Sequence, residues 1–182
     1  LVGPTYREHL RDLFRAGRIT GDMSLYVHRP TVTDPSAAPE GDDTFYALSP
    51  VPHLGHGAAD WGRFADSYKT RVADMLEPLL RGFRDRITAE RVFTPETFRD
   101  RYHSPFGAGF SLEPRILQSA YFRPHNVSED LPGLYLAGAG THPGAGVPGV
   151  IGTAEILDQL IPAPQVRAET PVHPGTLPLA AE

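Results

Sequence analysis

The sequence predicts a mixed fold, with α/β character in its last third and α+β character before it. Residues 133–161 combine a short apolar strand, a glycine-rich loop and a helix, in that order. Upstream, an amphipathic helix starting at Trp61 lies among short segments of strand-forming residues. A strand, loop and helix in series are typical of an α/β sheet, whereas strands and helices in mixed order favour an α+β unit.

The first part of the chain is expected to hold four short elements. Residues 6–16 have a helical pattern, and residues 25–27 and 45–48 have the composition of strands. Residues 30–43 are rich in proline and should connect these two strands.

The long helix that begins at Trp61 is expected to pack against a core. Its apolar residues recur at the 3.6-residue helical period: Trp61, Phe64, Ala65, Tyr68, Val72, Met75, Leu76 and Leu79. Gly82 is expected to end this helix. Residues 87–93 then have the composition of a strand, and Thr94 and Pro95 mark the N-cap and the first turn of another short helix.

The last third of the chain carries the most informative pattern. Residues 134–137 are apolar throughout, as in a strand buried on both faces of a parallel sheet. The loop 138–149 holds five glycines, which leave backbone N–H groups open to a ligand. A helix should begin at Pro148 and end before Pro162. Its apolar stripe would be Val147, Val150, Ile151, Ala154, Leu157 and Ile161.

The loop does not carry a complete dinucleotide-binding fingerprint. Residues 144–149 match GxGxxG, but the first of these glycines lies several residues beyond the strand, and no later strand offers an acidic residue for a ribose. A glycine-rich turn that packs a helix on a sheet without any ligand is the alternative reading.

Composition narrows the classes of partner. The chain has 17 Lys and Arg against 22 Asp and Glu, a formal net charge of −5, so nucleic acid is not an expected partner. It has no cysteine, which excludes disulfides and thiol chemistry. Neither a secretory signal nor an 18-residue apolar run is found in the sequence.

Several long segments resemble one family. LYLAGAGTHPGAGVPGV (134–150), preceded by SAYFRPHN (119–126), closely resembles the flavin-binding signature of the bacterial-type phytoene desaturases, or carotenoid desaturases. These are FAD-dependent members of the amine-oxidase-like flavoprotein superfamily. Three earlier segments look like the same family in the same order: SLYVHRPTVTDPSAAPEG (24–41), FYALSPVPHLG (45–55) and FTPETFRDRY (93–102).

The resemblance implies the C-terminal part of a two-domain FAD-dependent oxidoreductase. Residues 1–106 would belong to the substrate-binding domain, residues 107–161 to the FAD-binding domain, and residues 162–182 to a disordered, proline-rich tail. The ADP-binding strand, glycine turn and helix of the superfamily do not occur before Leu134, and the chain begins with Leu1. We therefore expect a missing N-terminal FAD-binding half and weak FAD binding by this chain alone.

The resemblance also assigns residues to FAD. One group would lie beside the ribityl chain: Gly138, Ala139, Gly140 and Thr141. A second group, at the helix N-terminus, would face the flavin ring: Val147, Pro148, Gly149 and Val150. Gly146, directly before them, would also bind the cofactor. Ala139 stands where amine oxidases often carry an acidic residue, which puts a carboxylate contact to the ribityl hydroxyls in doubt. Gly149→Asp is expected to abolish flavin retention.

The implied activity is desaturation of phytoene or a related carotenoid, with FAD as hydride acceptor. Such an apolar substrate implies a cytoplasmic enzyme bound peripherally to a membrane surface. Isomerisation, saturation or oxygenation of carotenoids on the same scaffold, and a non-catalytic remnant that binds a partner chain, are the alternatives. The resemblance identifies no catalytic acid or base.

A few other residues have two readings each. His142 fits a loop-structuring role better than proton transfer, and His53 with His56 makes only a weak metal-site pattern, so no metal is expected. Arg123 could contact flavin or substrate or form a structural ion pair, and with His125 it could hold the crossing to the cofactor together. Four aromatic residues could line an apolar tunnel, although ordinary core is the commoner role: Phe106, Phe110, Tyr121 and Phe122.

Overall fold

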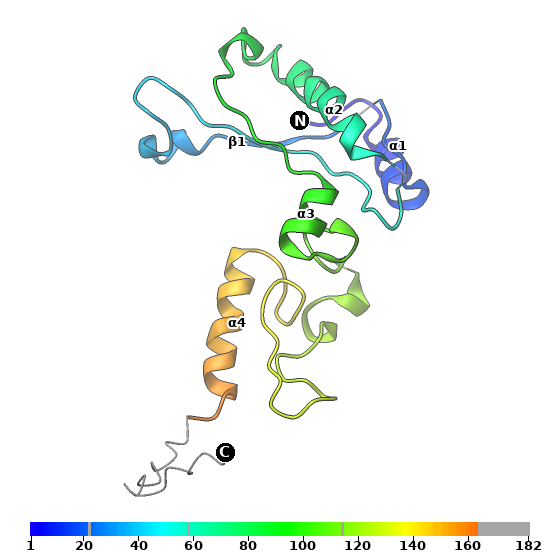
Figure 1. Ribbon diagram of the computed structural model, residues 1–182, viewed down its shortest axis with the longest axis vertical. Coiled ribbons are helices and arrows are strands. Elements are labelled where there is room, and N and C mark those ends of the chain that lie inside the picture. The colour runs from blue at the N-terminus through cyan, green and yellow to red at the C-terminus, as the bar shows by residue number, and fades with distance from the viewer. Residues whose placement is uncertain (22, 58, 114, 164–182) are drawn as a thin grey trace, which may run out of the picture. The chain divides into compact units, whose positions relative to one another are not determined.

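The computed structural model describes residues 1–21, 23–57, 59–113 and 115–163 (Figure 1). The chain divides into two compact units, unit 1 (Leu1–Glu113) and unit 2 (Pro114–Glu182). All but the first two residues of the expected tail at 162–182 lie outside the described residues. The assignment of residues 1–106 and 107–161 to a substrate domain and an FAD domain stays a prediction.

Unit 1 begins with a helix and a small sheet. Helix α1 (Tyr6–Arg11) continues into a π-helical turn (Asp12–Ala16), which confirms the helix expected over residues 6–16. Strands β1 (Tyr26–His28) and β2 (Tyr46–Leu48) pair antiparallel, with Tyr26 opposite Leu48. The two predicted strands are therefore confirmed to within one residue. The proline-rich connection between them forms two 3₁₀ turns, Pro30–Val32 and Pro35–Ala37.

The core of unit 1 lies under helix α2 (Trp61–Leu76). Trp61 and Tyr68 are buried together with Met23 and Leu25, and the Trp61 and Tyr68 rings meet edge to face at 5.8 Å. Phe64, Val72 and Met75 pack partly against this cluster. The apolar stripe read from the sequence is thus confirmed as the core-facing stripe of α2, except at Leu79, which lies beyond the helix and is exposed.

Helix α2 ends earlier than the sequence reading placed it. Pro78 has no backbone N–H to donate to the carbonyl one turn back, so the α-helix stops at Leu76, well before Gly82. The Glu77 carboxylate then accepts hydrogen bonds from the backbone N–H groups of Gly82 and Arg84. A short 3₁₀ turn, Arg84–Arg86, follows.

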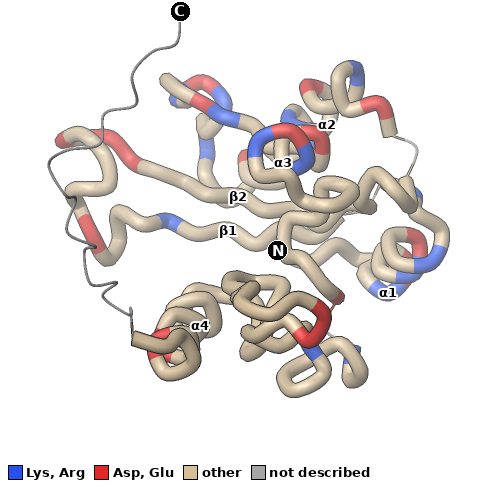
Figure 2. Tube along the Cα trace, turned by 60° about the horizontal axis from the view of Figure 1, so that its bottom comes forward, with Lys and Arg blue, Asp and Glu red and all other residues tan. Residues whose placement is uncertain are grey.

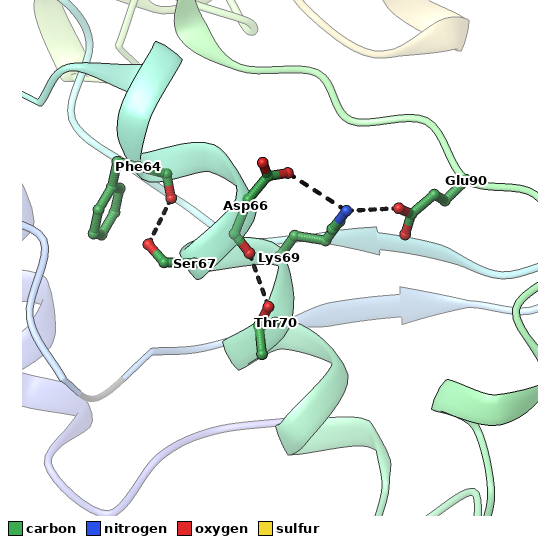
Figure 3. Close-up of polar contacts among 6 residues, drawn as sticks. All are labelled: Phe64, Asp66, Ser67, Lys69, Thr70 and Glu90. Atoms are coloured by element: carbon green, nitrogen blue, oxygen red, sulfur yellow. Dashed lines mark hydrogen bonds and ion pairs between the residues drawn. The ribbon is translucent and has the colours of Figure 1, made fainter.

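The strand predicted over residues 87–93 is wrong. This segment is exposed along its length and forms no ladder with any described residue. A strand needs a neighbour for its backbone groups, and composition alone does not supply one. Glu90 instead reaches α2, where its carboxylate lies 2.6 Å from Lys69 Nζ, and Asp66 lies 3.5 Å from the same amine (Figure 3). The hydrogen bond to Glu90 raises the pKa of Lys69 above its ordinary value.

Helix α3 (Pro95–Tyr102) begins where the sequence predicted. Thr94 accepts a hydrogen bond from the Thr97 N–H, and the Thr97 hydroxyl accepts one from the Thr94 N–H, which makes a capping box. A 3₁₀ turn, Pro105–Gly107, follows. Gly107 has φ of +68°, and a Cβ there would lie 2.0 Å from the Pro95 carbonyl oxygen, so only glycine fits this turn.

The described residues of unit 2 form two 3₁₀ turns, Ile116–Gln118 and Ala120–Phe122, and one α-helix, α4 (Val147–Leu160). The predicted helix is therefore confirmed, with Pro148 in its first turn. The predicted parallel strand at residues 134–137 is not formed: Tyr135 makes a single antiparallel bridge with Val127, and Leu134 is exposed. A strand inside a parallel sheet needs hydrogen-bonded neighbours along both of its edges. Among the described residues, only the segment around Val127 pairs with residues 134–137.

Charge is spread as mixed pairs. Figure 2 shows basic and acidic residues side by side around α3, while the tube of α4 is mostly uncharged. Exposed ion pairs of unit 1 include Arg99 with Asp100 at 2.6 Å and Arg84 with Asp74. Such pairs contribute little to stability, because water and salt screen them. The arginine-rich segment at residues 81–101 is therefore a solvated mixed-charge surface.

We predict that Tyr68 links the sheet to the core of unit 1. Its hydroxyl lies 2.5 Å from the Ser49 hydroxyl, next to the end of β2, and burial raises the pKa of Tyr68 above its ordinary value of 10.0. Tyr68→Phe should lower the free energy of unfolding by about 1 kcal/mol, because the partly buried Ser49 hydroxyl loses its partner. Urea unfolding followed by circular dichroism measures this, and Ser49→Ala combined with Tyr68→Phe should cost no more than Tyr68→Phe alone.

The same residue should make stability depend on alkaline pH. A tyrosine with a raised pKa in the folded state keeps its proton when the unfolded chain has lost it, so its contribution is present below pH 10 and is lost as pH rises above about 10. The Tyr68→Phe variant should lose stability less steeply than the parent chain over that range. Equal slopes for the two proteins would contradict this assignment.

Candidate cofactor-binding site

The glycine loop of unit 2 leads into the start of α4. Gly138, Gly144 and Gly146 have φ of +109°, +135° and +97°, which other residues rarely adopt. Gly146 is the N-cap of α4 and supplies no side-chain cap. The first-turn N–H groups of Val147 and Gly149 therefore lack the side-chain acceptor that helices commonly provide, and Val147 is exposed.

Asn126 ties the residue before the loop to a residue inside it. Its side-chain Nδ2 donates to the carbonyl oxygens of Leu136 at 3.1 Å and His142 at 2.9 Å. Its backbone carbonyl oxygen accepts from the Leu136 N–H at 2.8 Å. Asn126 is only 4% exposed, so these bonds form away from water. One side-chain amide thus holds the entry to the loop and its first half together.

Arg123 holds the middle of the loop. Its Nη1 donates to the Ala139 carbonyl oxygen at 2.7 Å, and the residue is 6% exposed. Its Nε lies 3.0 Å from the place where a Cβ on Gly144 would stand, so the guanidinium packs on a glycine. This contact agrees with a structural role for Arg123 in the loop.

Thr141 and His142 are also used within the loop. The Thr141 hydroxyl donates to the Gly138 carbonyl at 3.0 Å, and Thr141 is buried. His142 Nδ1 lies 3.0 Å from the Ala120 carbonyl oxygen and, because a carbonyl only accepts, this nitrogen carries the proton. His142 therefore has a loop-structuring contact, as the sequence favoured.

The start of α4 packs closely on the loop. A Cβ on Gly149 would lie 2.6 Å from the Gly144 carbonyl oxygen, so no side chain fits there. One turn on, the Thr153 hydroxyl donates to the Gly149 carbonyl at 3.1 Å, and Thr153 is buried. Gly149→Asp would consequently disturb the loop whether or not flavin binds, so that substitution cannot test a flavin contact.

The structure brings the predicted residues into one region of unit 2. All nine lie on the loop and the first turn of α4: Gly138, Ala139, Gly140, Thr141, Gly146, Val147, Pro148, Gly149 and Val150. With loop carbonyls bonded to buried donors and the helix N-terminus uncapped, this region can accept an anionic or electron-rich group. Whether these nine residues contact FAD stays a prediction.

Sequence reasoning missed Asn126. It lies within the SAYFRPHN segment, but no spacing rule marks an asparagine that bonds to a loop ten residues later. Its neighbour His125, for which the sequence suggested a role at the crossing to the cofactor, is exposed, and its Nδ1 lies 2.7 Å from the Glu129 carboxylate. The useful signal would have been an amide side chain just upstream of a glycine loop with many carbonyls to satisfy.

The expected core role of four aromatic residues is wrong. Phe106 and Phe110 of unit 1 and Tyr121 and Phe122 of unit 2 are all more than half exposed. His53 accepts a hydrogen bond from the Gly55 N–H at 3.1 Å, and its ring centroid lies 6.0 Å from that of His56. No group of three or more metal-ligating side chains gathers anywhere in the described ranges.

Among the helices in the part of the chain that the structure describes, none combines the length and the apolar character needed to cross a bilayer.

Comparison with known proteins agrees with the resemblance read from the motifs. Relatives named phytoene desaturase include the neurosporene-forming protein of Rhodobacter capsulatus, 64% identical over 174 residues, which are 94% of this chain and 33% of that protein. The lycopene-forming protein of Pantoea ananas is 47% identical over 84% of this chain and 31% of its own length. A 4,4'-diapophytoene desaturase of Staphylococcus haemolyticus is 42% identical over 83% of this chain and 31% of its own.

The chain spans about a third of the length of these relatives. The family model described as flavin containing amine oxidoreductase matches residues 24–156, which run from unit 1 through the loop and into α4. The chain therefore belongs to the flavin containing amine oxidoreductase family.

Proposed function

We propose that this chain is the C-terminal portion of an FAD-dependent desaturase that introduces double bonds into phytoene or a related carotenoid. The observation that carries the proposal is the uncapped start of α4 after a glycine loop, in a member of a flavoprotein family. The names of relatives that match most of this chain support the carotenoid substrate.

The residues present suit a flavin. The N-terminal end of a helix carries about half a positive charge, and the first turn of α4 has no side chain that neutralises it. A Cβ on Gly146 would meet nothing within 4 Å, so the backbone at the N-cap is open to close approach. In this proposal residues 147–150 face the ring, and residues 138–141 lie beside the ribityl chain.

FAD, when bound, would supply the acceptor for the hydride that leaves the carotenoid. The chain's own part is electrostatic: N–H groups at the start of α4 would favour the negative charge that reduction adds. Ala139 offers no carboxylate to the ribityl hydroxyls, but its carbonyl is held inward by Arg123. Orientation and charge stabilisation are therefore the roles assigned to these residues.

The substrate and partners follow from the same proposal. An apolar polyene partitions into lipid, so the whole enzyme would work in the cytoplasm at a membrane surface, as a peripheral protein. The ADP half of FAD would be held by an N-terminal FAD-binding half, consistent with relatives about three times as long as this chain. The chain alone should then bind FAD weakly and be inactive.

We predict that this chain can replace its counterpart in a relative. A chimera of the Rhodobacter capsulatus protein, with its matching third exchanged for this chain, should retain FAD and desaturate phytoene. Absorbance spectra of the purified chimera measure FAD, and chromatography of the carotenoids from phytoene-producing cells measures the product. The host protein without its matching third is the control.

The outcomes separate the candidate functions. New double bonds in the product would support the desaturase. An isomerised, saturated or oxygenated product in their place would contradict it. A chimera that folds but neither retains FAD nor changes phytoene would favour a non-catalytic remnant.

A second prediction tests which part of α4 faces the ring. Val147 is exposed in the first turn, where a carboxylate ordinarily stabilises a helix by about 0.3–1 kcal/mol. Val147→Glu in the chimera should therefore leave the protein folded yet weaken FAD retention about tenfold or more, because a negative charge would lie beside the ring. Equilibrium dialysis against FAD measures the change.

Two variants control for size and for charge elsewhere. Val147→Gln introduces a side chain of the same shape as glutamate but without its charge. Ile151→Glu places the carboxylate one turn further along α4, at another exposed position. Both should retain FAD nearly as well as the parent chimera. If Val147→Glu also retains FAD fully, the ring does not lie at this end of α4.

A further inference from the structure

We propose that Arg123 and Asn126 are positioning residues for the flavin: they hold the carbonyls of Leu136, Ala139 and His142 inward, so that these carbonyls do not face the cofactor and the charge of Arg123 acts on it. This inference rests on the proposed function, because it takes the loop to be the FAD-binding segment. Neither residue was among the nine assigned to FAD.

The loop carbonyls point toward buried donors. Those of Leu136, Ala139 and His142 all accept hydrogen bonds from buried side-chain donors of residues 123 and 126. The Gly138 carbonyl accepts from Thr141 in the same way. A carbonyl that points toward a buried donor cannot point toward a ligand, so a negatively charged group approaching the loop meets less repulsion.

The two side chains hold different parts of the loop. Asn126 bonds to Leu136, just before the loop, and to His142 within it, which fixes the distance between these residues. Arg123 bonds to Ala139, between them, and packs on Gly144, which fixes the path of the chain toward α4. Loss of either side chain leaves partly buried carbonyls without that donor, and such groups cost free energy until the backbone turns away.

Arg123 also brings a positive charge to the loop. Arg123 is a buried cation whose Nη1 lies 2.7 Å from the backbone of the proposed ribityl-side segment. Reduction adds negative charge to a flavin, and a positive charge held in a low-dielectric setting favours that form more than it would in water. Arg123 should therefore raise the preference of the site for reduced FAD, a contribution that a purely structural side chain would not make.

The experiment uses the chimera described above and four variants. Arg123→Met removes the charge and keeps most of the volume, whereas Arg123→Lys keeps the charge. Asn126→Asp has nearly the same shape but no N–H donor. His125→Ala is the matched control, because His125 lies between them in the sequence and its Nδ1 contacts only the exposed carboxylate of Glu129. FAD content, thermal unfolding and the reduction potential of bound FAD are measured for each.

We expect Arg123→Met to lower the preference for reduced over oxidised FAD about tenfold, which is about 30 mV for a two-electron couple. Arg123→Lys should recover most of that potential. Asn126→Asp should retain FAD about tenfold or more less well than the parent, because the carbonyls of residues 136 and 142 lose their donor and face a carboxylate. His125→Ala should match the parent in both measurements.

The result that overturns the inference is a parent chimera that binds FAD while the variants change only the thermal midpoint. Variants that retain little FAD are measured on the fraction that carries it, so the potential of Arg123→Met against Arg123→Lys still decides the role of charge. A parent chimera without FAD would instead contradict the proposed function, so the two failures are distinguishable.

Discussion

The carboxamide of Asn126 is the interaction on which the rest of unit 2 depends. One buried NH₂ group satisfies a carbonyl just before the glycine loop and another within it, and the backbone of the same residue pairs with Leu136. Because glycine loops have few side chains of their own to fix their path, their order has to come from neighbouring segments. Here it comes from a stretch directly upstream, which crosses beside the loop and supplies donors at the positions where carbonyls turn inward.

Local signals were predicted well from the sequence. Thr94 and Pro95 mark the start of α3, Pro148 lies in the first turn of α4, and the stripe that begins at Trp61 is the core face of α2. Each of these features depends on residues that are close together in the sequence, so the local sequence pattern is enough to predict it. The prediction that missed the end of α2 overlooked a local signal of the same kind, Pro78.

Features that need a distant partner were predicted poorly. The segments at residues 87–93 and 134–137 have strand composition, but a ladder requires neighbours that composition does not reveal. The candidate site shows the same division. Its glycines and the helix start were readable from the loop itself, whereas the bonds of Arg123 and Asn126 to Ala139, Leu136 and His142 depend on how two segments cross.

The contact between Gly149 and the carbonyl of Gly144 has a consequence for how this region can change over evolutionary time. The backbone there has no space for any side chain, while Val147, Val150 and Ile151 on the same turns are exposed. Substitutions can accumulate at the exposed positions without moving the main chain of the loop and the helix start. The surface around the loop can therefore change in sequence while its backbone stays the same.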